Sequence, residues 1–377
     1  MPESSSQNYW DREIAKWREH SIPEPVKSKV LEAISYLRAE LGEDFLINAI
    51  IPNPGLILPW PTHPIVNMLA FISDWNIDLL IALSEQLSEV KAHSTNYEKI
   101  LDKLKDREQC LEGFSILKSA YRFSKVGFDI AIEPTISNKT PDLIIKDREN
   151  STELLVEVTI VGRPAVFEAS VENSTILGRY FQESGRGLAA DITFYKLYSK
   201  AHLDEILNND IKNVVNEVKN SNTPKTITIN GGMAITISSS NNPNGGGLLS
   251  SSGPRYEINY ITRLMQRIED KQKNYKQINN YPKIIILQSN FMEIKDPESF
   301  INVLEEDIYD FTDLAYVMVV NEYLADERTE ARETYGDHRY IKRFKNMQNE
   351  KDVILVNRFC TLQIPASTKH KIYTSYE

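Results

Sequence analysis

The sequence predicts an α/β fold in which a mixed central sheet, flanked by helices, follows an all-helical N-terminal region. Three observations lead to this prediction. Apolar residues recur at helical spacing in the first hundred residues, a β-branched hairpin follows at Thr140–Ile160, and Pro282–Asn290 is a nearly continuous apolar run. A strand that is apolar throughout is expected at the centre of a sheet, where both of its faces are covered.

The composition is that of an ordinary folded protein. Of 377 residues, 41% are hydrophobic and 25% are charged, which is close to the average for globular domains. The two cysteines are far apart and indicate no disulfide framework, so we expect a cytoplasmic protein. The N-terminus lacks a basic segment followed by an apolar one, and the apolar windows are broken by charges. Neither a signal peptide nor a membrane span is therefore expected.

Residues 1–100 are predicted to form the helical N-terminal region, and residues 101–377 a single α/β domain. Trp10, Ile14 and Trp17 share one helical face, and the polar segment Lys91–Tyr97 marks the expected boundary. The region carries no residue pattern for chemistry. Because it is acidic and helical, it is a candidate contact for a second copy of the chain or for a partner protein.

The hairpin places two carboxylates opposite each other. If the polar cluster Asp147–Thr152 is the loop, Lys146 pairs with Glu153, and counting back places Asp142 opposite Glu157. Side chains that face each other across antiparallel strands have Cβ atoms about 4.5–5.5 Å apart, and like charges there repel. Two such carboxylates beside a buried strand need a cation or a shared proton.

The elements around the hairpin are predicted from periodicity and turn residues. Before it, a long helix and a short alternating strand are expected. After it, a loop-rich insertion, a helix, a second hairpin turning at Gly231-Gly232, and a low-complexity loop are expected. The corresponding ranges are Glu98–Phe123, Phe128–Pro134, Gly162–Leu188, Asp191–Val218, Lys225–Ser238 and Asn241–Gly253.

A helix predicted over Tyr256–Gln277 carries a row of basic residues. Arg263, Arg267 and Lys271 follow one another at intervals of four, so they lie along one side of the helix. The row drifts toward the apolar stripe of the helix, which places Lys271 at the border of its buried face. Two further apolar strands are expected at Ala315–Val320 and Val353–Asn357.

The order of these elements, with Pro141-Asp142 before one strand and Glu157-Val158-Thr159 on the next, resembles the PD-(D/E)XK, or restriction-endonuclease-like, nuclease superfamily. The resemblance covers roughly Lys105–Asn290. It implies that Asp142, Glu157 and the Val158 carbonyl hold Mg²⁺, which prefers such oxygen ligands and for which Mn²⁺ is a possible substitute. A metal there lowers the pKa of a bound water and neutralises charge on the phosphate.

The sequence departs from the superfamily pattern at one position. Thr159 stands where the family usually has a lysine, and a hydroxyl cannot supply a cation. In some members a lysine from a neighbouring element takes this place. Lys271 is our candidate, and Lys196 and Lys200 are second choices.

The resemblance also suggests supporting residues. Glu112 corresponds to an acidic residue on the first core helix, and Gln272 with Tyr275 lies near the position of a glutamine motif that contacts nucleic acid. The section between residues 161 and 280 is the only basic one in a chain of net charge −10, which suits a local polyanion surface. The candidate nucleic-acid contacts are Arg163, Arg179, Arg186, Arg263, Arg267 and Gln272.

The expected function is therefore a Mg²⁺-dependent endonuclease acting on DNA, for which the superfamily suggests a role in restriction or phage defence. Two alternatives stay open. Thr159 is compatible with a decayed nuclease fold that binds nucleic acid or regulates, and the acidic helical N-terminus with a structural subunit of a larger complex. No nucleotide-binding P-loop or zinc-ligand spacing is present.

Overall fold

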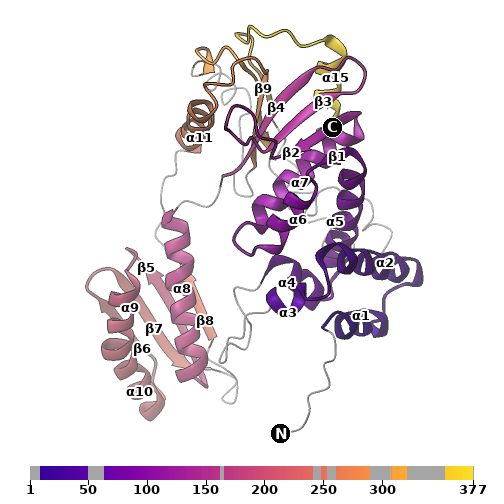
Figure 1. The fold of residues 1–377 in the computed structure, drawn as a ribbon. Helices are drawn as coiled ribbons and strands as arrows, with labels where there is room; N and C mark the ends of the chain where they lie inside the picture. Colours follow the sequence, from indigo (N-terminus) through magenta and orange to yellow (C-terminus); the bar gives the residue numbers. More distant parts are fainter. Residues whose placement is uncertain are drawn as a thin grey trace. The chain divides into compact units, whose positions relative to one another are not determined.

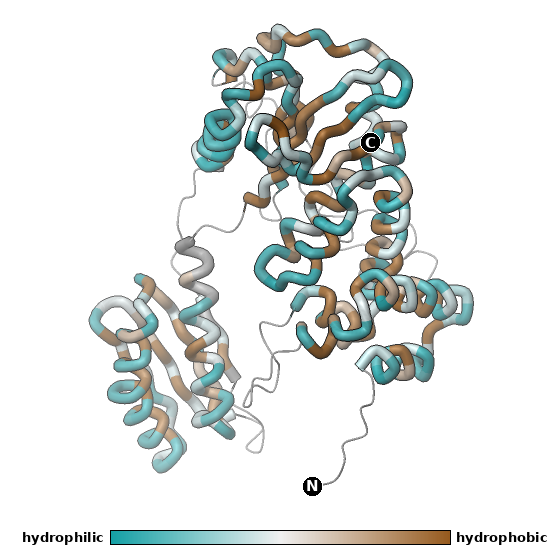
Figure 2. Tube along the Cα trace, in the orientation of Figure 1, coloured by the Kyte–Doolittle hydropathy of each residue, from teal (hydrophilic) through white to brown (hydrophobic). Residues whose placement is uncertain are grey.

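The computed structural model describes residues 9–49, 63–161, 165–240, 248–252, 260–288, 306, 308–320 and 353–376. The chain divides into two compact units, shown in Figure 1. Unit 1 consists of Met1–Val161 and Tyr260–Glu377, and unit 2 of Gly162–Asn259. Unit 2 is thus inserted into the sequence of unit 1. Figure 2 shows hydrophobic strands within each unit and hydrophilic outer faces on many of the helices.

The described part of unit 1 contains a mixed sheet of seven strands. Their order is β1-β2-β3-β4-β9-β10-β11. Strand β1 is parallel to β2, and β9 is parallel to both of its neighbours, β4 and β10. The other neighbouring strands are antiparallel. The expected mixed α/β sheet is confirmed. The strands are β1 (Ser94–Thr95), β2 (Phe128–Ile132), β3 (Leu143–Asp147), β4 (Glu153–Ile160), β9 (Lys283–Gln288), β10 (Leu314–Val320) and β11 (Val353–Val356).

Strand β9 lies between β4 and β10, as its continuous apolar run predicts. Its residues from Lys283 to Leu287 are all buried, because helices cover both faces of the sheet. On one face, α7 contacts β2, β3 and β4, and on the other α11 contacts β9. The helices of unit 1 are α1 (Tyr9–Glu19), α2 (Glu24–Leu41), α3 (Phe45–Ala49), α4 (Pro64–Ala70), α5 (Asp74–His93), α6 (Glu98–Lys105), α7 (Cys110–Lys125), α11 (Tyr260–Asn274) and α15 (Ala366–Thr374).

A boundary was expected near residue 100, whereas the division into compact units keeps Met1–Val161 together. Trp10 and Leu80 from the N-terminal helices belong to the same hydrophobic core as Leu117 of α7 and Val156 of β4. Helices α5 and α7 are in direct contact. The N-terminal helices therefore cover one side of the sheet domain. None of the helices that the structure describes is long and apolar enough to span a membrane.

The helix expected over Glu98–Phe123 is two helices. Helix α6 ends at Lys105 and α7 begins at Cys110. Between them, the Asp106 carboxylate accepts hydrogen bonds from the backbone N–H groups of Glu108 and Gln109, at 2.8 and 3.3 Å. An acidic side chain that satisfies such N–H groups starts a new helix in place of continuing the old one.

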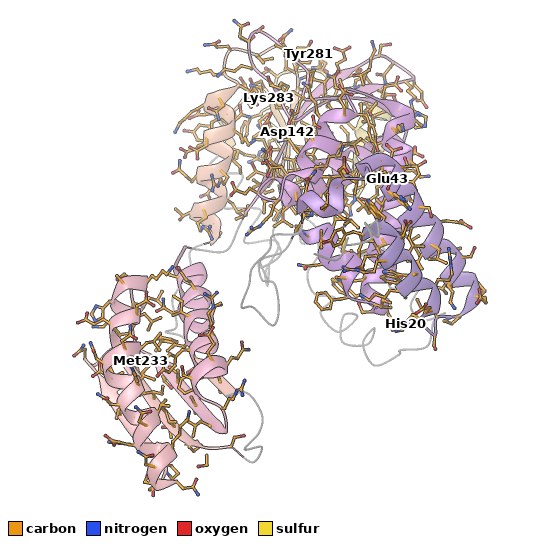
Figure 3. The ribbon with its side chains drawn as sticks, turned by 60° about the horizontal axis from the view of Figure 1, so that its bottom comes forward. His20, Glu43, Asp142, Met233, Tyr281 and Lys283 are labelled. Carbon is orange, nitrogen blue, oxygen red and sulfur yellow. The ribbon has the colours of Figure 1, made fainter. Side chains whose placement is uncertain are left out.

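Unit 2 is a two-layer arrangement of helices on a four-stranded sheet. Its helices and the inward side chains of the sheet share one apolar core, in which Met233 is fully buried (Figure 3). The strand order is β6-β7-β5-β8. The elements are α8 (Ala165–Ser184), β5 (Leu188–Phe194), α9 (Lys200–Ile206), the π-helical turn η1 (Leu207–Ile211), α10 (Lys212–Ser221), β6 (Lys225–Ile229), β7 (Met233–Ser239) and β8 (Leu248–Ser252).

The hairpin at Gly231-Gly232 is confirmed, and three other expectations for this unit are wrong. The predicted loop-rich insertion is mostly helix α8, whose Leu177 and Phe181 stack four residues apart into the core. The segment predicted as one helix begins with β5, where alternate residues from Leu188 to Phe194 are buried. The low-complexity loop contains β8, which pairs in parallel with β5.

A buried aspartate anchors helix α15 to the β3–β4 hairpin. Asp147 is fully buried, accepts a hydrogen bond of 2.6 Å from the Thr368 hydroxyl, and lies 2.7 Å from Lys371 Nζ. The Asn150 amide donates to Asp147 Oδ2 at 2.9 Å, the same oxygen that accepts from Thr368. The same amide donates to Thr368 at 2.8 Å. The hairpin loop and the C-terminal helix are therefore held by one polar network.

We predict that Asp147→Ala destabilises the protein by about 3 kcal/mol, because it removes the buried carboxylate that binds the Lys371 ammonium and the Thr368 hydroxyl. Urea denaturation measures the loss. Asp129→Ala is the matched control, since it removes an exposed partner of Arg148 on the same sheet and should cost about 1 kcal/mol or less. Equal losses in the two variants would contradict the assigned role of the network.

Candidate active site

The hairpin register brings Asp142 and Glu157 together as the sequence predicts. Lys146 pairs with Glu153 next to the hairpin loop, and Leu143 pairs with Val156 at the far end of the strand pair. Asp142 immediately precedes β3 and therefore lies across from Glu157. Both side chains are buried, with 9% of Asp142 and 2% of Glu157 exposed. Two carboxylates thus meet inside unit 1, on the face of the sheet that α11 covers.

Two backbone N–H groups, one just before β3 and one in β4, bind the two carboxylates. The Val158 N–H donates to Asp142 Oδ2 at 2.7 Å, and the Asp142 N–H donates to Glu157 Oε1 at 3.3 Å. In a β-strand, the N–H and C=O of one residue point to the same edge. The Val158 carbonyl therefore points to the edge on which Asp142 lies, beyond the last recorded β3–β4 pair.

Lys271 reaches this pair from helix α11. Its Nζ lies 2.7 Å from Glu157 Oε2 and 3.6 Å from Asp142 Oδ2. Its side chain is only 25% exposed, so the ammonium is largely enclosed. Of the three lysines considered, the structure brings Lys271 to the carboxylates, whereas Lys196 and Lys200 belong to unit 2. Thr159 follows on the same strand, two residues after Glu157.

Two contacts hold the end of α11 in place. Just after the helix, the Tyr275 hydroxyl donates to the Thr140 carbonyl at 3.0 Å. The buried Lys283 Nζ donates to the Tyr275 carbonyl at 2.9 Å and lies 2.5 Å from Asp313 Oδ2. Lys283 and Asp313 were not predicted as site residues. A lysine opening an otherwise apolar strand was their one signal in the sequence.

The environment of the carboxylates disfavours their charged forms. Burial and the Asp142 carboxylate raise the pKa of Glu157 to about 7, although Lys271 opposes this shift. Burial also raises the pKa of Asp142, against the influence of Lys271 and of the Val158 N–H. Burial acts to lower the pKa of Lys271, but the two carboxylates outweigh it and the pKa is raised. The two carboxylates therefore favour positive charge beside them, and the single Lys271 ammonium does not balance both of their charges.

Glu112 lies near this pair but is bound to another cation. Lys103 Nζ lies 2.7 Å from Glu112 Oε1 and 3.0 Å from Glu133 Oε1. Gly113 permits this arrangement, since a Cβ there would lie 3.1 Å from the Lys103 Cβ. After the larger effect of burial, the charge of Glu112 also contributes to the raised pKa of Asp142. Lys103 and Glu133 were not predicted, because their pairing depends on how α6 packs on α7.

The predicted nucleic-acid contacts are divided between the two units. Arg267 and Gln272 lie on α11, where Arg267 is exposed and Gln272 is 6% exposed. The Gln272 Nε2 has no hydrogen-bond partner among the described residues. Arg263 is half-buried on the same helix. Arg179 and Arg186 are exposed residues of unit 2, and Arg163 lies outside the described residues.

The oxygen atoms around Asp142 could supply some, but not all, of the ligands of a hard divalent cation. Within the described residues, no group of three or more His, Cys, Asp and Glu side chains forms a ready metal site. Two carboxylates and the Val158 carbonyl nevertheless supply only oxygen ligands, and Mg²⁺ commonly takes one or two carboxylates and keeps several waters. The raised pKa values of both acids are the state expected of such ligands without a metal. The residues present therefore fit Mg²⁺.

The pH dependence of stability tests this electrostatic account. The pKa of Glu157 is higher in the folded protein than in the unfolded chain, so its contribution to stability is lost as the pH rises from about 4.5 to about 7. Glu157→Gln stays neutral. Without divalent ions, its free energy of unfolding relative to wild type should therefore increase between about pH 5 and pH 8.

Urea denaturation at a series of pH values measures this difference. Glu153→Gln, at the half-exposed start of β4, is the control for the loss of one charge. A Glu157→Gln difference that stays constant over this pH range would show that the carboxylate is not held in the way described.

Comparisons of this chain with models of protein families, with curated proteins and with solved structures find no match. What the chain does is therefore inferred from its own residues around Asp142 and Glu157.

Proposed function

We propose that this protein is a metal-dependent nuclease that hydrolyses phosphodiester bonds of DNA, with Mg²⁺, or Mn²⁺ in its place, at the Asp142–Glu157 pair. One observation carries the proposal. The Lys271 ammonium, from a helix 114 residues further along the chain, lies 2.7 Å from Glu157 and 3.6 Å from Asp142. Two acids and a lysine converge there in the absence of a lysine at position 159.

The order of elements supports the same proposal. Helix α7, the antiparallel strands β2, β3 and β4, helix α11 and the parallel strand β9 follow one another in the chain. This is the order expected from the resemblance to PD-(D/E)XK nucleases, with unit 2 inserted between β4 and α11. The acids come from two adjacent strands and the lysine from the helix that covers them.

Each residue has a distinct task in this proposal. Asp142, Glu157 and the Val158 carbonyl would hold the metal, which lowers the pKa of a bound water and neutralises charge on the phosphate. Lys271 lies beside Glu157 and would orient the attacking water by hydrogen bonding. Glu112, which shares Lys103 with Glu133, would add negative charge at the margin of the site.

A second candidate function is nucleic-acid binding or regulation without cleavage. Thr159 and the Lys271 ion pairs favour it, because Lys271 partly compensates the two carboxylates without any metal. This alternative requires that polyanion binding persist and that Mg²⁺ and Mn²⁺ produce no cleavage. A nuclease assay on single- and double-stranded DNA and RNA separates the two functions.

We predict that Asp142→Ala and Glu157→Ala each reduce Mg²⁺-dependent cleavage by at least about a hundredfold, since each removes a charge at the site of transition-state stabilisation. Initial rates on DNA measure the effect. Glu153→Ala, on the same strand as Glu157 but paired with Lys146, is the matched control and should cleave like wild type. Wild-type rates in either site variant would refute the proposed role of the pair.

The position of the lysine can be tested by moving it. Lys271→Met should lower the cleavage rate about a hundredfold or more, because it removes the cation that holds the water. Adding Thr159→Lys to that variant places an amine on the face that carries Glu157 and should restore a measurable part of the rate. The control is Lys146→Met, which removes an exposed lysine of β3 paired with Glu153 and should cleave like wild type. If Lys271→Met cleaves as fast as wild type, Lys271 does not serve this reaction.

A further inference from the structure

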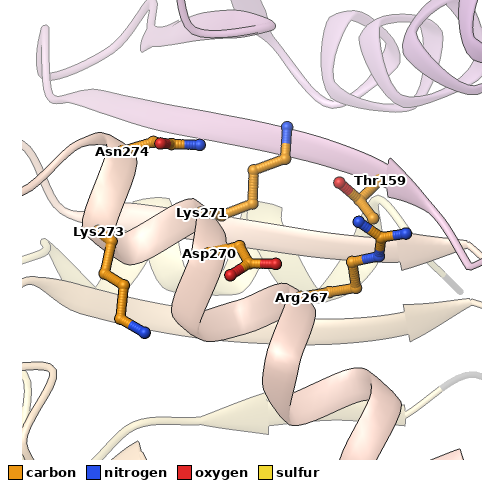
Figure 4. Close-up of a pocket in the computed structure, with 6 residues that line it drawn as sticks. All are labelled: Thr159, Arg267, Asp270, Lys271, Lys273 and Asn274. Atoms are coloured by element: carbon orange, nitrogen blue, oxygen red, sulfur yellow. The ribbon is translucent and has the colours of Figure 1, made fainter.

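A cavity next to the carboxylate pair has no role in the chemistry described above. Its volume is ≈ 420 Å³, and it opens between strand β4 and helix α11 (Figure 4). This volume lies within the usual range for small-ligand sites, about 300–1,000 Å³. The lining residues are Thr159, Arg267, Asp270, Lys271, Lys273 and Asn274.

Arg267 is the cation in this cavity that lacks a partner. Its side chain is exposed, and it forms no hydrogen bond or ion pair with a residue that the structure describes. The other two cations are engaged, since Lys271 contacts Glu157 and Lys273 lies 3.1 Å from Glu269. Figure 4 shows Arg267 and Lys271 extending from α11 toward β4, with Arg267 beside Thr159. An unpaired guanidinium is a strong donor for a phosphate.

Thr159 on β4 and Arg267 on α11 lie at similar distances from the carboxylate–lysine site, measured along their own elements. Thr159 lies two residues after Glu157, or about 6.6 Å along the strand. Arg267 lies four residues before Lys271, or about 6 Å along the helix. Glu157 and Lys271 therefore face each other across β4 and α11, and Thr159 and Arg267 face each other about 6 Å further along. This step is comparable with the separation of neighbouring phosphates in an extended polynucleotide.

We propose that this cavity is a subsite for the nucleotide next to the cleaved bond, with its phosphate bound by Arg267. The inference rests on the proposed nuclease function. Thr159 makes the subsite possible, because a lysine at this position would extend into the space that a nucleotide needs. Asp270, Asn274 and the Thr159 hydroxyl supply a carboxylate, an amide and a hydroxyl. This mixture suits the sugar and base of a nucleotide better than a free anion.

Chimeric DNA oligonucleotides test the subsite. The parent has neutral methylphosphonate linkages except for one cleavable phosphodiester, and two derivatives restore the charge of the adjacent linkage on the 5′ or the 3′ side. In wild type, one of these two charges should lower KM about tenfold or more with little change in kcat, as expected of a charge-assisted hydrogen bond. Arg267→Ala should lose this gain, and Arg267→Lys should keep part of it.

The control is Arg18→Ala, which removes an exposed arginine of helix α1 and should retain the full gain. If wild type cleaves and Arg267→Ala keeps the gain, the subsite is refuted while the proposed function stands. If wild type does not cleave, the proposed function fails, and binding of the same oligonucleotides without metal decides on the subsite. A charge-dependent gain in affinity that Arg267→Ala loses supports the subsite, and one that it keeps overturns it.

Discussion

The burial of two facing carboxylates is the constraint on which the rest of this structure depends. Asp142 and Glu157 meet because the β3–β4 hairpin closes in the register that pairs Lys146 with Glu153. Water is largely excluded there, so their charge must be compensated from within the protein. Two backbone N–H groups contribute, but the main compensation is the Lys271 ammonium. A strand pair thus depends on a helix that lies more than one hundred residues away in the chain.

This dependence explains several features of unit 1 that are not themselves chemical. Helix α11 must be held at a fixed position over β4 for Lys271 to reach Glu157. The Tyr275 hydrogen bond to Thr140 fixes the end of the helix. Lys283, which is paired with Asp313, fixes it through the Tyr275 carbonyl. Strand β9 must be parallel and adjacent to β4, which places the end of α11 beside the hairpin. A buried lysine that contacts both a helix end and an aspartate is costly unless every donor is used. We therefore assign Lys283 the role of positioning the end of helix α11.

The sequence was sufficient where the relevant contacts are local. The hairpin register follows from loop length, and the place of Lys271 follows from the helical row that contains Arg263 and Arg267. Contacts between distant elements were not readable in the same way. The Lys103–Glu112 pair depends on the close approach of α6 and α7 at Gly113. The N-terminal helices were expected to form a region of their own, but they share their apolar faces with α7 and the sheet, a packing that periodicity alone does not reveal. Strand β5 does alternate, but its Ala-Ala-Asp segment is weakly apolar.

Moving a cation from a strand to a helix has consequences beyond charge balance. A lysine at position 159 would both serve the carboxylates and fill the space beside them. With the cation supplied by α11, position 159 is free to hold a small residue. The helix that brings Lys271 to Glu157 also brings Arg267 to Thr159, because a turn of helix and two residues of strand advance by similar distances. In the proposed function, the residue at position 159 would therefore couple the source of the catalytic cation to the shape of the adjoining cavity. On the proposed function, Thr159 would be a determinant of substrate binding, and the lack of a lysine at this position would not by itself indicate a decayed nuclease.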